Sequence, residues 1–192
     1  MIASPSAFLR VGALLLLAVI LQLSTLSRLG ILGGHLDVVV LAVAAVAYYA
    51  GSVPGSATGF AAGFLLDLLS GATMGVSSLV LTAVGYGVGR FRDVRDPSHG
   101  LLPVPVGAVA TAYWVVAVAA VSFMLDVGAT VSPLVIRDMV VTVLLSTLLA
   151  PGVFTGTRKL LRPVLAVDPF EVRRRRRAPR ETGPLGLRGL EV

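Results

Sequence analysis

The sequence predicts an all-α, polytopic membrane protein: a bundle of six transmembrane helices followed by a basic tail. Composition is the first reason. Of the 192 residues, 56% are hydrophobic and 14% are charged, and the mean hydropathy is +0.90. A soluble domain of this size could not cover so much apolar surface with polar side chains. The second reason is a series of long uncharged runs, and the third is an uneven distribution of charge between the segments that join them.

Each predicted span is an uncharged run that ends at a charge or a turn signal, because a helix needs about 20 mostly apolar residues to cross a bilayer. The first run, 11–27, lies between two arginines, and no small-residue cleavage site follows it, so we expect a retained helix rather than a signal peptide. The next run contains the turn signal GSVPGS at 51–56, which divides it into two helices. The five later spans are expected at about 36–51, 54–70, 76–89, 103–125 and 139–157.

Two segments are not expected to span. Residues 126–138 (DVGATVSPLVIRD) are partly apolar but too short, and they are expected to lie in the membrane interface. From Arg158 the chain is basic and rich in proline and glycine, so it cannot form a core. The predicted domains are therefore a six-helix transmembrane domain, 1–157, and a disordered cytoplasmic tail, 158–192.

Charge predicts the orientation, because short loops rich in Lys and Arg stay in the cytoplasm. With six spans, Arg10, the 90–96 loop and the tail fall on one side with a net charge of +8. The other side carries −2, and the two values add to the formal +6 of the chain. Both termini are thus expected in the cytoplasm. If residues 36–70 formed a single span, there would be five spans and the amino terminus would lie outside, so the turn at 51–56 decides the count.

The most informative motif is a glycine ladder that ends in an acid: Gly55, Gly59, Gly63 and Asp67, four residues apart. Small residues at this spacing let a second helix approach closely, so the glycines indicate helix packing. A four-residue repeat drifts about 40° per step on a helix, so Gly55 has begun to rotate away from the other three. Two interpretations of Asp67 remain: a cap or a side chain that reaches toward water, or a structural or partner contact.

Other candidate motifs are weaker. Gly85, Gly87 and Gly89 do not follow a strand, so helix packing is favoured over a nucleotide-binding loop. His35 and His99 fall in predicted loops on opposite sides of the membrane and cannot pair. The chain has no cysteine, and no acid pair, Ser–His arrangement or metal-binding cluster stands out. An enzyme, a cofactor and a metal site are therefore not expected.

Aromatic, hydroxyl and basic residues receive structural interpretations. Tyr113 and Trp114 lie in the middle of a span and are expected in the bundle core. The hydroxyls of Ser78, Thr82, Thr142 and Ser146 are expected to bond their own helix backbones or a neighbouring helix, and no chemistry is assigned to them. Five arginines in a row could contact nucleic acid in a soluble protein, but beside a transmembrane helix they are expected to bind anionic lipid headgroups. These are Arg173, Arg174, Arg175, Arg176 and Arg177.

Residues 36–89 resemble the signature region of the MreD family of bacterial rod shape-determining proteins. The shared elements are an acid that opens the second helix, the tight turn after it, the Gly-x-x-x-Gly-x-x-x-Asp helix, a glycine after a short turn, and a tyrosine in the next helix. In this sequence the first, fourth and fifth elements are Asp37, Gly75 and Tyr86, and the glycine-ladder helix ends at Asp67. The resemblance implies that Asp37 caps the second helix.

The resemblance further implies a non-catalytic scaffold subunit of the cell-elongation complex in the bacterial cytoplasmic membrane. Its partners would be MreC and, through MreC, the MreB filament, RodA and a class B penicillin-binding protein. The family's bundle is also similar to the S components of energy-coupling vitamin transporters, so the alternative is a subunit that binds a small, vitamin-like ligand near Asp67 and Asp126. A vitamin pocket needs several polar groups in the outer half of the bundle. The sequence offers few there beyond the acids, which favours the scaffold.

Overall fold

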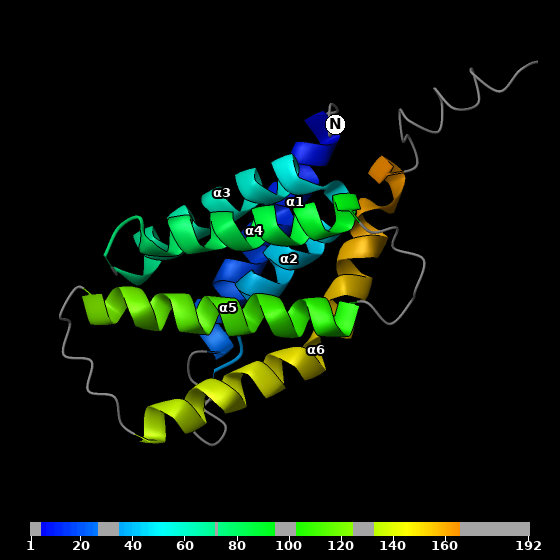
Figure 1. Ribbon diagram of the computed structural model, residues 1–192. Helices are drawn as coiled ribbons and strands as arrows, with labels where there is room; N and C mark the ends of the chain where they lie inside the picture. The colour runs from blue at the N-terminus through cyan, green and yellow to red at the C-terminus, as the bar shows by residue number, and fades with distance from the viewer. Residues whose placement is uncertain (1–4, 27–34, 72, 95–102, 125–132, 166–192) are drawn as a thin grey trace, which may run out of the picture.

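The computed structural model describes residues 5–26, 35–71, 73–94, 103–124 and 133–165. These residues form a bundle of helices, and no strand occurs among them, which confirms the all-α class (Figure 1). The elements are α1 (Pro5–Leu21), the short π-helix η1 (Gln22–Leu26), α2 (Val38–Ala50), α3 (Ser52–Ser70), α4 (Val76–Val94), α5 (Pro103–Met124) and α6 (Pro133–Leu165).

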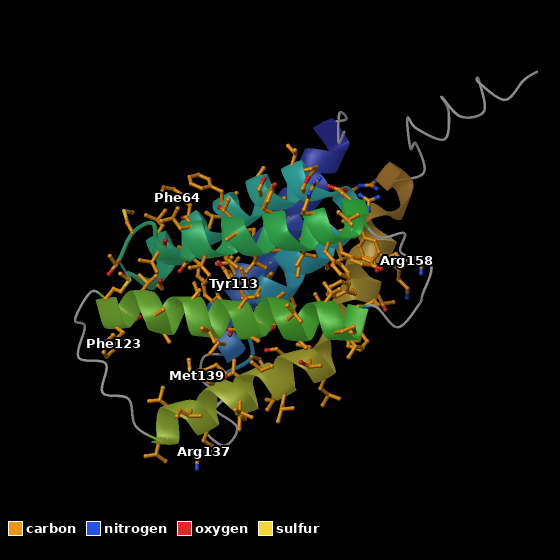
Figure 2. The ribbon with its side chains drawn as sticks, viewed as in Figure 1. Phe64, Tyr113, Phe123, Arg137, Met139 and Arg158 are labelled. Carbon is orange, nitrogen blue, oxygen red and sulfur yellow. The ribbon has the colours of Figure 1, made fainter. Side chains whose placement is uncertain are left out.

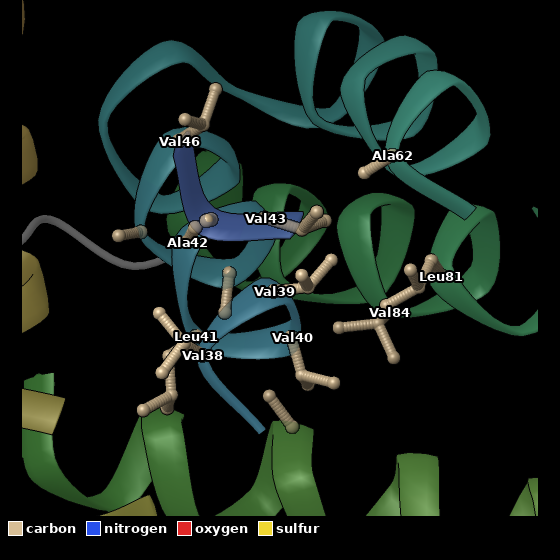
Figure 3. Packing of buried hydrophobic residues seen from close by; sticks show 14 of the residues in the cluster. Val38, Val39, Val40, Leu41, Ala42, Val43, Val46, Ala62, Leu81 and Val84 are labelled. Atoms are coloured by element: carbon tan, nitrogen blue, oxygen red, sulfur yellow. The ribbon is translucent and has the colours of Figure 1, made fainter. Parts of the chain in front are cut away.

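Helix α2 is the centre of the bundle. It contacts each of the other five α-helices, and every residue from Val38 to Tyr48 is buried. Its sequence explains this position, because a helix that is apolar on all sides has no face to present to water. Figure 3 shows its side chains directed to several sides, among neighbours that include Ala62, Leu81 and Val84.

The outer helices expose apolar side chains. Large hydrophobic residues are exposed on five of them, for example Leu17, Phe60, Leu79, Val109 and Leu148. A soluble protein rarely leaves so many exposed on every side, whereas a bilayer solvates them. Three helices are long and apolar enough to cross a membrane: Ser52–Ser70, Pro103–Met124 and Leu134–Leu161. The helical membrane bundle is therefore supported, and the crossing of all six helices remains a prediction.

The break between the second and third helices is confirmed, and it is tighter than expected. Gly51 alone separates α2 from α3, with φ at +99°, a conformation that glycine adopts without strain. The predicted turn at 51–56 is otherwise helical. Pro54 lies in the first turn of α3, where its missing N–H costs no intrahelical hydrogen bond.

Helix α6 is longer than the predicted span of 139–157, which changes two expectations. It begins at Pro133, so residues 133–138 are helical rather than a separate interfacial segment, and residues 126–132 lie outside the described residues. It also continues to Leu165, so the predicted boundary at 157 falls inside a helix. The reason is that Phe154, Thr157 and Leu161 recur every three to four residues and are all buried. Residues 166–192 lie outside the described part.

Candidate functional site

Helices α3 and α4 form the closest pair in the bundle, and the glycine ladder is the surface through which they meet (Figure 1). A Cβ added at Gly63 would lie 2.5 Å from the carbonyl oxygen of Ser77 and from the Cα of Ser78. A Cβ at Gly59 would overlap the carbonyl oxygen of Leu81. Backbone lies against backbone at both positions, so only glycine fits there.

The contact is reciprocal, since α4 contributes glycines of its own. A Cβ at Gly85 would overlap the carbonyl oxygen of Gly55, and one at Gly89 would overlap Ser52. Gly85 and Gly89 therefore serve helix packing, as the sequence indicates. A Cβ at Gly55 would lie 2.6 Å from both the Cβ of Ala47 and the carbonyl oxygen of Gly85. Because a four-residue repeat rotates around the helix, Gly55 lies where α2, α3 and α4 meet.

Asp67 is the next member of the ladder and is 1% exposed, so it does not reach water. Its carboxylate is directed to the following helix. Oδ2 accepts a hydrogen bond of 2.8 Å from the backbone N–H of Gly75, and Oδ1 accepts one of 3.3 Å from the N–H of Ser77. Because α4 begins at Val76, the Ser77 N–H belongs to the first turn, which has no intrahelical acceptors. Asp67 thus caps the helix that follows its own.

The position of Asp67 carries costs as well as gains, and the first cost is the lost hydration of a buried carboxylate. It lies in the last turn of α3, where a negative charge opposes the helix dipole by about 0.3–1 kcal/mol. Each hydrogen bond to a charged group contributes about 1.5–3 kcal/mol, and the positive end of α4 adds to this. The cap therefore outweighs the unfavourable dipole, and Asp67 locks the α3–α4 hairpin. We call Asp67, Gly75 and Ser77 the clasp.

Two glycines shape the turn that brings the clasp together. Gly71 ends α3 in the left-handed conformation with φ at +65°, and Gly75 precedes α4 with φ at +97°. Residues with a side chain are strained at these angles. Asp67 and Gly75, both singled out in the sequence, are therefore brought into direct contact.

The other predicted site residues do not join the clasp. Tyr86 lies on α4 but is 55% exposed, on a side of the helix that faces out of the bundle. Tyr113 is likewise half exposed rather than in the core, whereas Trp114 is buried as expected. The five arginines at 173–177 lie outside the described residues.

Asp37 belongs to a second, separate polar cluster, and it does not cap α2 as the resemblance implied. It precedes the helix, but its side chain makes no capping hydrogen bond. Gln22 of η1 does this instead: its Oε1 accepts a hydrogen bond of 2.9 Å from the N–H of Val39, in the first turn of α2. Its Nε2 donates to Oδ1 of Asp37 at 3.1 Å. The longer side chain of Gln22 reaches the first turn of α2, and the carboxylate of Asp37 holds the Gln22 amide in place.

Helices α5 and α6 complete this second cluster. The indole of Trp114 on α5 lies near the Asp37 carboxylate. The N–H of Asp37 donates to Oγ of Ser146 at 3.4 Å, and the N–H of His35 donates to Oγ1 of Thr142 at 3.0 Å. Polar groups from three parts of the chain, η1, residues 35–39 and α6, thus satisfy one another at the start of α2, where a buried unpaired group would be costly.

Sequence reasoning missed this cluster, although one signal was available. Gln22 is the only glutamine in the chain and interrupts an otherwise apolar run. A side-chain amide there requires a partner, because lipid offers none. The π-helix that carries it is a rare element that often marks functional positions, but it cannot be read from sequence.

Both clusters are built from hydrogen bonds that hold backbone and carboxylate in place. Among the described residues, no group of three or more His, Cys, Asp or Glu side chains is placed to hold a metal ion. The hydrogen bonds of the two clusters hold helices in position. The clasp fixes α3 against α4, and the Asp37 cluster fixes α1 and α6 to the start of α2.

The fold and the site together define a helical membrane protein whose distinctive feature is a tight, acid-capped helix pair. The family model of the rod shape-determining protein MreD matches residues 6–160. The chain belongs to this family, and a role in determining rod shape follows from that membership. No curated protein and no solved structure matches the chain, so the similarity to vitamin-transporter S components stays a prediction.

Proposed function

We propose that this protein is a non-catalytic scaffold subunit of the bacterial cell-elongation complex, held in the cytoplasmic membrane, and that it supports lateral peptidoglycan synthesis through MreC. The observation that supports a scaffold is the clasp: Asp67 is buried and accepts two backbone hydrogen bonds. Its charge stabilises a helix hairpin instead of facing a substrate. A rigid helix pair with exposed apolar faces is suited to bind other membrane proteins.

MreC is the proposed direct partner, and the MreB filament, RodA and a class B penicillin-binding protein are proposed as indirect partners through MreC. The alternative of a vitamin-binding subunit would need polar groups free to meet a ligand. That ligand was expected near Asp67 and Asp126. Both carboxylate oxygens of Asp67 accept backbone hydrogen bonds instead, and Asp126 lies outside the described residues. The scaffold is therefore the function that the geometry favours.

The test is affinity purification of the tagged, full-length protein from membranes of a rod-shaped bacterium. We expect MreC to co-purify, and depletion of the protein to turn rods into spheres. A tagged, unrelated multi-pass protein serves as the control for non-specific capture. Recovery of a vitamin-sized molecule by mass spectrometry, with MreC absent, would support the transporter subunit and contradict the scaffold.

We also propose six membrane crossings with both termini in the cytoplasm, on the basis of the +8 against −2 charge asymmetry. The two ends of α4 provide a matched test, because the chain has no native cysteine. Met74, just before α4, and Val94, its last residue, are both strongly exposed. In intact cells an impermeant thiol reagent should label Met74→Cys and not Val94→Cys, and both should react after permeabilisation. Labelling of Val94→Cys in intact cells would reverse the proposed orientation.

A further inference from the structure

A groove with a volume of about 470 Å³ lies between α4 and α5. From α4 it is lined by Ala83, Gly87 and Phe91 among others, and from α5 by Pro105, Val109 and Tyr113 among others. Figure 2 shows Tyr113 between these two helices. Of all the lining side chains, only that of Tyr113 carries a polar group. Val109 is 69% exposed, so the groove opens on the outer surface of the bundle.

The groove exists because α4 presents small residues on this side. A Cβ added at Gly87 would meet no atom within 4 Å, in contrast to Gly85 and Gly89 on the α3 side. An unfilled apolar groove loses the dispersion contacts that packed atoms would gain. In a bilayer the available apolar filler is a lipid chain or another helix.

The size of the groove suits a hydrocarbon chain. Its α4 part runs from 83 to 91, which is about 12 Å of helix. This length and the volume of about 470 Å³ accommodate a single flexible chain.

Charge at one end of the groove indicates which lipid. Arg90 lies seven residues, or two helical turns, from Ala83 and therefore on the same side of α4, at the rim of the groove. It is exposed, and no ion pair to it occurs among the described residues. Asp93, an acid near it in the chain, is directed with Arg92 toward Gly51, on the α3 side.

The start of α5 adds to this positive end. Helix α5 begins at Pro103, and Pro105 lines the groove together with Phe91 of α4. The start of α5 lies at the same end of the bundle as the end of α4 (Figure 1). Pro103 and Pro105 carry no N–H, so the first turn of α5 offers an anion the N–H of Val104 and the partial positive charge of a helix amino terminus. An arginine and a helix amino terminus at the same end of an apolar groove complement a phosphate that is attached to a hydrocarbon chain.

We propose that this groove binds one acyl chain of an anionic phospholipid, with the phosphate held by Arg90 and the amino terminus of α5. This site differs from the arginine run at 173–177, which would attract anionic headgroups without selecting a chain. It also stands independently of the proposed scaffold function.

Trp114, the only tryptophan in the chain, provides the readout, because it is next to Tyr113 and four residues from Ala110, both of which line the groove. The full-length protein is placed in phosphatidylcholine vesicles with a small fraction of brominated phosphatidylglycerol or, separately, brominated phosphatidylcholine. Bromine atoms near an indole quench its fluorescence. We expect phosphatidylglycerol to quench Trp114 more strongly than phosphatidylcholine at the same fraction, and salt to reduce the difference.

Variants of α4 and one control variant of α6 test whether the excess quenching comes from the groove. Arg90→Gln removes the charge, and Gly87→Leu fills the groove, with Ala83→Leu as a second filling variant if Gly87→Leu does not fold. Each should abolish the excess quenching. Arg137→Gln should retain it, because Arg137 is also an exposed arginine but lies at the opposite end of the bundle from Arg158 and the start of α5 (Figure 2).

Several outcomes would overturn the proposal. Equal quenching by the two lipids would remove the selectivity, and loss of the excess on changing all five tail arginines to Gln would assign it to the tail. A photo-crosslinker on Val109→Cys tests the other occupants in native membranes. Crosslinking to lipid is expected, whereas crosslinking to a second copy or to another membrane protein would show that a helix covers the groove.

Discussion

Gly63→Leu is expected to lower the amount of folded protein sharply. Even the first carbon of the new side chain would lie 2.5 Å from Ser77 and Ser78, and the contacted atoms belong to the backbone. Backbone in a packed helix pair cannot move aside as a flexible side chain can. Overpacking of an interior costs about 1–3 kcal/mol for added methylenes, and a whole leucine side chain against backbone lies at or above this range.

The measurement is the folded yield in detergent together with the midpoint of thermal unfolding. Gly63→Ala gives a graded version, because one methyl group already overlaps α4. Gly156→Leu is the matched control: it makes the same change in α6, where an added Cβ meets no atom within 4 Å. The control should fold normally, since replacement of a helical glycine usually stabilises a helix by about 0.5–1 kcal/mol. Equal behaviour of the two leucine variants would refute close α3–α4 packing at Gly63.

Much of the fold could be predicted because its main signals are local. The α2–α3 break, the glycine ladder and the long apolar runs each occupy one stretch of sequence, and the structure has a helix for every predicted span. The limits of α6 were wrong because helix ends depend on packing. Leu161 is buried and belongs to the helix, although the charges at 158 and 159 indicate the end of an apolar run.

The candidate site was predicted only in part, for a related reason. Asp67 and Gly75 were recognised as important, but the hydrogen bond between them depends on how the turn at 71–75 folds back. The Asp37 cluster joins residues separated by 15 to 109 positions. No periodicity or spacing in a single sequence encodes such contacts. These contacts arise from the arrangement of the helices around α2.

Asp67→Asn is expected to destabilise the protein by about 1–3 kcal/mol, the usual cost of a buried polar group that loses its partner. The amide keeps the shape of the side chain and one acceptor oxygen. Its –NH₂ group must face the N–H of either Gly75 or Ser77, both of which donate to Asp67 in the native protein. One backbone donor is then left unsatisfied inside the bundle. Asp67→Leu leaves both unsatisfied and should cost more.

Asp138→Asn is the matched control, because Asp138 is a partly exposed acid of α6 that forms an ion pair with its neighbour Arg137. It should unfold at the same temperature as the native protein.

Two measurements on the Asp67 variants separate the clasp from a direct partner contact. Hydrogen exchange should become faster at one of the Gly75 and Ser77 amides in Asp67→Asn, which keeps one acceptor oxygen, and at both in Asp67→Leu, while the amides of α2 should change little. MreC capture, normalised to the amount of folded protein, should stay at the native level for Asp67→Asn, because the carboxylate is directed into the hairpin. If capture per folded molecule falls while exchange at Gly75 and Ser77 is unchanged, Asp67 acts on the partner directly and the clasp is not its role.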